Sequence, residues 1–138
     1  MSRGKILIRG SLVRAAYGVV ALGFPQFIFG SIGIKEPDPD ARYVNRLFGG
    51  RDVLVAGQTL IAVASGNGKS AVAANLFAEA TDTVALVEEI RIRRKLDRVL
   101  IVGILFNAFG YLTWFRALFA GSGQSAAAEA SGPEAAGD

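Results

Sequence analysis

The sequence predicts an all-α integral membrane protein, a bundle of about four transmembrane helices that occupies residues 1–120. Apolar residues make up 51% of the 138 residues, and the mean hydropathy is +0.38. These residues gather in continuous blocks of about 20, which is typical of helices surrounded by lipid. A water-soluble domain of this length needs more polar residues to cover its surface. The length leaves room for one domain only.

The first helix is expected over residues 11–34. Pro25 lacks a backbone donor, so it should kink or break this helix. Three basic residues precede the apolar block, as they do in a signal peptide: Arg3, Lys5 and Arg9. However, Arg14 interrupts the block and no small-x-small cleavage site follows it, so we expect no cleavage.

The second helix is expected over residues 47–65, after a polar turn at 35–46. Asp40 is the expected N-cap of this helix. The turn that follows, Ser65-Gly66-Asn67-Gly68-Lys69-Ser70, imitates a phosphate-binding loop. That motif needs a glycine where this chain has Val63, so we predict a loop between membrane helices and no nucleotide site.

The third helix, expected over residues 70–90, is the most polar of the four. Asn75, Glu79 and Asp82 follow one another at helical spacing, so they share a face that should look into the bundle. If this helix lay on the membrane surface instead, the chain would have three spans.

The fourth helix is expected over residues 99–119. Gly103, Asn107 and Gly110 lie on one face, which suits close contact with another helix. Tyr111 and Trp114 are expected at the membrane–water interface. Residues 121–138 are small and polar or acidic, so we predict a disordered tail there.

Charged and polar residues inside the apolar blocks form a candidate intramembrane cluster: Arg14, Arg51, Asp52, Gln58, Glu79, Asp82 and Asn107. A lone charge at the bilayer centre costs about 2.5–3.5 kcal/mol, so such residues need partners or a wet cavity. We favour interhelical pairing that fixes the bundle over a path for an ion or substrate. Arg51 is expected to pair with Asp82, although Arg14 competes for Asp82 and Asp52 offers Arg51 a local partner.

A second candidate site is the densest basic run of the chain, which comprises Arg91, Arg93, Arg94, Lys95 and Arg98. No aromatic residue is interleaved with it, which argues against nucleic-acid binding. Its place between two apolar blocks predicts contact with anionic lipid headgroups. The expected partners are therefore membrane lipids, with a second membrane protein or another copy of the chain left open.

Composition also excludes several chemistries. The chain has no cysteine and no histidine, and its only methionine is Met1. Disulfides, structural zinc, iron–sulfur clusters and triads of the Ser-His-Asp or Cys-His kind are therefore excluded. These exclusions leave open a Ser-Lys pair or a carboxylate mechanism, but we expect no metal, no cofactor and no enzymatic activity.

Three stretches carry a resemblance to a known family. They are Arg14 with Gly18 and Pro25, the segment 47–57 with Phe48-Gly49-Gly50-Arg51-Asp52, and the segment 80–85 around Asp82. Over residues 11–119 the chain resembles a group of small bacterial membrane proteins, common in actinobacteria, known as the DUF4267-like group. The resemblance implies a four-helix protein of the bacterial plasma membrane and no particular activity. We therefore expect a structural or accessory subunit of the cell envelope, with a small transporter or channel component as the alternative.

Overall fold

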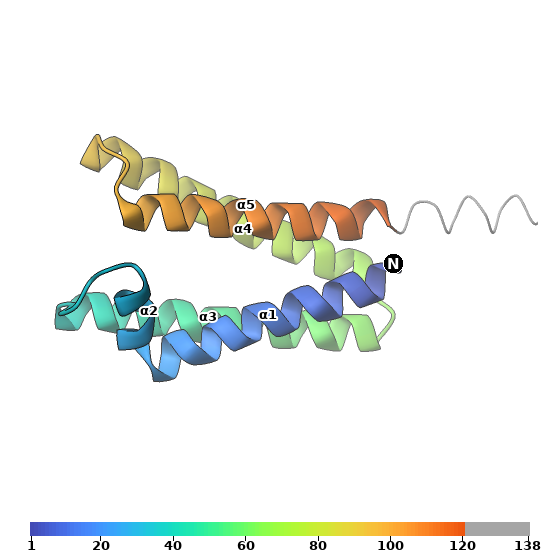
Figure 1. Ribbon diagram of the computed structural model, residues 1–138. Helices are drawn as coiled ribbons and strands as arrows, with labels where there is room; N and C mark the ends of the chain where they lie inside the picture. The colour runs from blue at the N-terminus through green and yellow to red at the C-terminus, as the bar shows by residue number, and fades with distance from the viewer. Residues whose placement is uncertain (121–138) are drawn as a thin grey trace, which may run out of the picture.

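The computed structural model describes residues 1–120, and the predicted tail at 121–138 lies outside them. The described residues form five helices and no strand: α1 (Arg3–Gly23), α2 (Pro25–Ser31), α3 (Pro39–Ala64), α4 (Gly68–Arg93) and α5 (Arg98–Phe119). The all-α prediction is confirmed for this part of the chain. The four long helices run back and forth in an elongated bundle, so that the start of α1 and the end of α5 lie at one end (Figure 1).

The start of the first helix differs from the prediction. α1 begins at Arg3, eight residues before the expected residue 11. Ile6 and Leu7 are buried in an apolar cluster with Val72 and Trp114, so packing extends the helix through its basic residues. The expected break at Pro25 is confirmed, because α1 ends at Gly23 and Pro25 starts the short α2.

α3, which corresponds to the second helix expected from the sequence, also begins earlier than predicted. Its N-cap is Asp38 rather than Asp40, since the Asp38 side chain accepts a hydrogen bond of 2.7 Å from the Ala41 amide. Pro39 then occupies the first turn, where its missing N–H leaves no bond unmade. α3 therefore takes up residues 39–46, which were expected to be a turn.

α1 and α3 cross with their backbones in contact. A Cβ atom added to Gly18 would lie 2.7 Å from the Gly49 carbonyl oxygen, and one added to Gly49 would lie 2.7 Å from the Gly18 carbonyl oxygen. No side chain fits at either position unless the helices move apart. Contacts between small residues are how helices pack closely in membranes, where apolar surface alone gives little preference for a partner.

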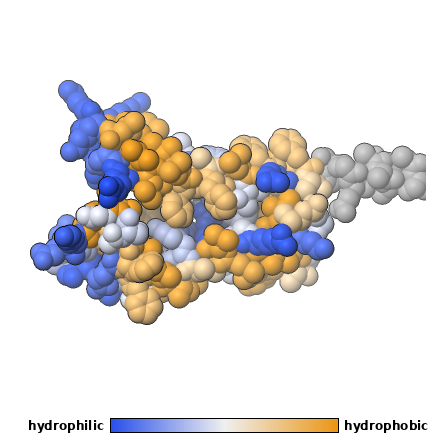
Figure 2. All heavy atoms as spheres, in the orientation of Figure 1, coloured by the Kyte–Doolittle hydropathy of each residue, from blue (hydrophilic) through white to orange (hydrophobic). Residues whose placement is uncertain are grey.

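The outer surface of the bundle is strongly apolar. Many large apolar side chains are exposed, including Phe27, Ile61 and Phe77, the last of which is 72% exposed. In Figure 2 hydrophobic residues cover most of the middle of the visible face, and hydrophilic ones gather at the left-hand end. α1, α3 and α5 are long and apolar enough to cross a membrane, and α4 does not meet the same criterion. Residues 1–120 thus contain three helices of transmembrane character.

Candidate functional site

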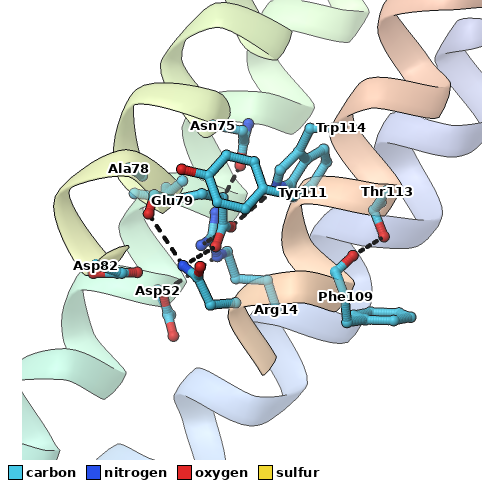
Figure 3. A network of polar contacts seen from close by, with 12 residues as sticks. Arg14, Asp52, Asn75, Ala78, Glu79, Asp82, Phe109, Tyr111, Thr113 and Trp114 are labelled. Atoms are coloured by element: carbon cyan, nitrogen blue, oxygen red, sulfur yellow. Dashed lines mark hydrogen bonds and ion pairs between the residues drawn. The ribbon is translucent and has the colours of Figure 1, made fainter. Parts of the chain in front are cut away.

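A single arginine connects three helices in the middle of the bundle. Arg14 of α1 donates from Nη1 to Asn75 Oδ1 at 2.8 Å and from Nη2 to Glu79 Oε1 at 2.6 Å, both on α4. Its Nε lies 3.2 Å from Asp52 Oδ1 on α3. All three guanidinium nitrogens therefore face acceptors (Figure 3). The Arg14 side chain is only 11% exposed.

Glu79 extends this network to α5. Besides the bond from Arg14, its Oε1 accepts a hydrogen bond of 3.0 Å from the Trp114 indole N–H. Asn107 donates to the Glu79 backbone oxygen at 3.1 Å and approaches Oε2 at 3.5 Å. Gly110 leaves the space for the carboxylate, because a Cβ there would lie 2.5 Å from it. The buried Glu79 carboxylate thus accepts hydrogen bonds from both α1 and α5.

Neutral polar side chains complete the network on both sides of Glu79. Asn75 donates from its amide to Thr59 Oγ1 at 2.7 Å, which adds a second contact to α3. Thr83 lies one turn beyond Glu79, and its hydroxyl bonds to Asn107 Oδ1 at 3.0 Å and lies 3.1 Å from the Tyr111 hydroxyl. We call the set centred on Arg14 and Glu79 the inner network: Arg14, Asp52, Thr59, Asn75, Glu79, Thr83, Asn107, Tyr111 and Trp114.

A second ion pair lies next to the inner network. Arg51 of α3 donates from Nη1 and Nη2 to the two carboxylate oxygens of Asp82 on α4, at 2.5 and 2.9 Å. The two side chains are 30% and 33% exposed, so this pair is less buried than Arg14. The predicted pairing of Arg51 with Asp82 is confirmed. The competing partners, Arg14 and Asp52, pair with each other instead.

The structure brings six of the seven candidate residues together. Four belong to the inner network, namely Arg14, Asp52, Glu79 and Asn107, and Arg51 and Asp82 form the adjoining pair. Gln58 is the exception, because its side chain is exposed and makes no hydrogen bond with the described residues. One residue further along, a rotation of about 100° places Thr59 inward, and Thr59 takes the polar position instead.

The interfacial depth expected for Trp114 stays a prediction, but its side chain lies inside the bundle. Trp114 is 2% exposed and donates to Glu79, and the Arg14 guanidinium carbon lies 5.7 Å from its ring centroid. The signal was present in the sequence. The stripe of Gly103, Asn107 and Gly110 reaches Trp114 when it is extended by one more helical turn.

The basic run lies on the surface at the opposite end from the N-terminus. Arg91 bonds to Glu88 at 2.8 Å, and Arg93 bonds to Glu89 at 2.5 Å and to Asp97 at 2.8 Å. The Leu100 amide and the Arg93 guanidinium hold the pKa of Asp97 below its ordinary value. The rest of the run, Arg94, Lys95 and Arg98, forms no ion pair within residues 1–120.

Two cavities lie away from the inner network. One of about 330 Å³ is formed by α1 and the turn before α4, and one of about 270 Å³ by α2 and the start of α3. Neither is lined by a residue of the network. Among the described residues, no group of histidine, cysteine, aspartate or glutamate is arranged to hold a metal ion. The inner network thus consists of ionisable and polar side chains packed between helices, and neither cavity opens onto it.

No protein family, curated protein or solved structure matches the chain. The resemblance to the DUF4267-like group stays a prediction. The geometry of the network is consequently the observation from which function is argued.

Proposed function

We propose that this chain is a multi-pass protein of the bacterial plasma membrane and acts there as a non-enzymatic structural or accessory subunit. The observation that carries the proposal is the pairing of the charged side chains at mid-bundle. Arg14 forms ion pairs with Asp52 and Glu79, and Arg51 forms one with Asp82, so that the pairs connect three helices. Polar and ionic contacts of this kind hold membrane helices together.

In this proposal α4 is the fourth span. Its exposed positions between residues 73 and 87 carry no charge: Ala73, Ala74, Phe77, Ala80, Thr81, Val84, Ala85 and Val87. The two acids in that segment, Glu79 and Asp82, are turned toward Arg14 and Arg51. With 26 residues, the helix is about 39 Å long, which exceeds the roughly 30 Å hydrocarbon core. By composition alone α4 is too polar for a membrane span, but its charged residues in this segment face the other helices instead of lipid.

A structural role also fits the distribution of hydrogen bonds. The donors that surround Glu79 come from α1 and α5, and the partners of Arg14 come from α3 and α4. The network thus ties every long helix to at least one other. A bundle fixed in this way presents an apolar outer surface on which lipids or a second membrane protein can pack.

Purification from its native membrane in mild detergent, followed by mass spectrometry, tests the subunit proposal. We expect a complex larger than one chain, made of this protein with a membrane partner or with further copies. The protein should also stay with the membrane after carbonate washing, because apolar helices hold it there. Release by carbonate, or a purely monomeric protein at native abundance, would contradict the proposal.

The second candidate is a small transporter or channel component. The observation that favours it is the concentration of ionisable groups at mid-bundle, a feature of proton and ion pathways in membranes. Purified protein in liposomes with an imposed proton or potassium gradient separates the two candidates. The structural proposal predicts no flux above empty liposomes, whereas a flux abolished by Asp82→Asn would establish the transport function.

A further inference from the structure

The charges in the middle of the bundle do not cancel. Two guanidinium groups, Arg14 and Arg51, face three carboxyl groups, Asp52, Glu79 and Asp82. Arginine keeps its proton in proteins. With every carboxyl ionised, two positive and three negative charges leave a net charge of −1. No other lysine or arginine of residues 1–120 forms an ion pair with these acids. A net charge at membrane depth is costly, so one positive charge is missing from the set.

The three carboxyl groups differ sharply in how they are bonded. Glu79 accepts hydrogen bonds from Arg14 and Trp114, and Asp82 accepts two from Arg51. Asp52 lies 3.2 Å from Arg14 Nε, but neither of its oxygens accepts a hydrogen bond from the described residues. Hydrogen bonds to an ionised carboxylate stabilise its charge. Asp52 is therefore the carboxyl whose charge the protein compensates least.

The groups around Asp52 come from three helices. α1 contributes Arg14 and the phenol of Tyr17, α4 contributes Glu79 and Asp82, and Arg51 precedes Asp52 on α3. Both arginines already form a shorter ion pair with another carboxylate. Arg14 lies 2.6 Å from Glu79 and Arg51 lies 2.5 Å from Asp82, against 3.2 Å between Arg14 and Asp52. The Asp52 side chain is also 17% exposed, so it is not sealed within the bundle.

From this geometry we infer that Asp52 is a proton-binding site at membrane depth, which takes one proton from water and so brings the charged set to neutrality. The neutral carboxyl keeps a dipolar contact with the Arg14 Nε, while Arg14 retains Glu79 and Asn75. Release of the proton restores a full ion pair between α1 and α3. Protonation therefore removes the ion pair between Arg14 and Asp52 and makes the net charge of the five groups zero. The contact between α1 and α3 thus becomes sensitive to pH at Asp52. Proton binding at Asp52 rests on the membrane location proposed above and requires no transport activity.

Infrared spectroscopy of the protein reconstituted in liposomes tests this site, because a protonated carboxylic acid has a carbonyl stretching band that a carboxylate lacks. At neutral pH we expect one such band, which disappears as the pH is raised and is absent in Asp52→Asn. The matched control is Asp97→Asn, which removes an exposed acid at the end of the bundle and should leave the band unchanged. Because removal of any one of the three carboxyls balances the charges, Asp52→Glu locates the proton: it keeps a carboxyl at this position, so the band should remain but at a shifted frequency. An unshifted band in Asp52→Glu, or a band that persists in Asp52→Asn, would place the proton on another carboxyl and overturn the assignment.

Charge balance itself is tested by Asp82→Asn. This change leaves two cations and two carboxyls, so Asp52 no longer needs a proton and the band should weaken at neutral pH. An unchanged band would contradict the charge argument. A wild-type protein with no band would overturn the proposal. If its thermal midpoint then rises when sodium replaces choline at constant ionic strength, a metal cation supplies the missing charge.

Should Asp52→Asn fold poorly, the wild-type protein alone gives a second measurement. The thermal midpoint in detergent should change with pH across the range in which the carbonyl band appears. A midpoint independent of pH while the band titrates would separate the proton from the stability of the bundle, and would contradict the proposed coupling between α1 and α3.

Discussion

Two groups of ion pairs in this molecule have similar geometry and opposite surroundings. Arg14 and Glu79 lie 2.6 Å apart with side chains 11% and 5% exposed, whereas Arg91 and Glu88 lie 2.8 Å apart with side chains 70% and 56% exposed. The inner pair joins two helices, and the outer one joins residues three apart on a single helix. Removing one partner leaves a stranded charge inside the bundle but a hydrated one at its end. Burial and connectivity, rather than distance, decide which pair holds the fold together.

The largest effect is expected from Arg14→Met. Methionine fills much of the same volume but leaves Glu79 and Asp52 without their cation, and breaking a buried pair typically costs about 3–5 kcal/mol. Arg91→Met is the matched control and should change stability by less than about 0.5 kcal/mol. Unfolding in detergent followed by circular dichroism measures both. Equal losses for the two variants would remove the distinction between the inner and outer pairs.

A smaller effect is expected from Gly110→Ala, which tests how closely α5 covers the Glu79 carboxylate. The new methyl group would lie 2.5 Å from that carboxylate, so the helices must move apart at a cost of about 1–3 kcal/mol. Gly57→Ala on α3 is the control, because a Cβ there meets nothing within 4 Å. Thermal unfolding should show a loss for the first variant and none for the second. A Gly110→Ala protein as stable as the wild type would mean that α5 packs less closely than described.

Loss of the ion pair between Arg51 and Asp82 should cost less than loss of the Arg14–Glu79 pair and more than loss of the exposed Arg91–Glu88 pair. Each single substitution to alanine should destabilise, and the double variant should recover part of the loss, since neither charge is then stranded. Pairs in membrane proteins couple by about 0.6 kcal/mol on average and up to about 1.7 kcal/mol. Strictly additive losses in a double-mutant cycle would mean that this half-exposed pair behaves like the outer ones.

The smallest effect concerns acid at the exposed end. The pKa of Asp97 is lowered by the Leu100 amide and Arg93, so its ionised form stabilises the start of α5. That contribution is present above the unfolded-state pKa of about 3.9 and is lost as the pH falls through the lower folded-state value. Asp97→Asn should therefore reduce the acid sensitivity of α5 helicity only slightly. A large loss of global stability in this variant would show that the end of the bundle is as critical as its middle.

Sequence reasoning reached the features that depend on local spacing. Pro25 interrupts a helix because of its own chemistry, and Glu79 and Asp82 share a face because a helix repeats every 3.6 residues. The pairing of Arg51 with Asp82 followed from opposite charge at similar depth. These inferences needed no knowledge of how the helices cross.

Features that depend on the crossing of helices were beyond the sequence. The contact of Gly18 with Gly49 fixes how α1 lies on α3, and this geometry decides that Asp52 meets Arg14 instead of Arg51. The choice of Thr59 over Gln58 has the same origin. The early start of α1 depended on Ile6 and Leu7 finding partners on α4 and α5, which local pattern does not reveal.

The proposed crossing of the membrane by α4 depends on α1 and α3, whose arginines pair with its Glu79 and Asp82. The natural chain has no cysteine, so a single cysteine at Asn67 or at Lys95 reports which side of the membrane each end of α4 occupies. An impermeant maleimide added to intact spheroplasts should label one of the two positions, and the other should react only after lysis. Labelling of both positions from the same side would show that α4 does not cross, and would contradict the account.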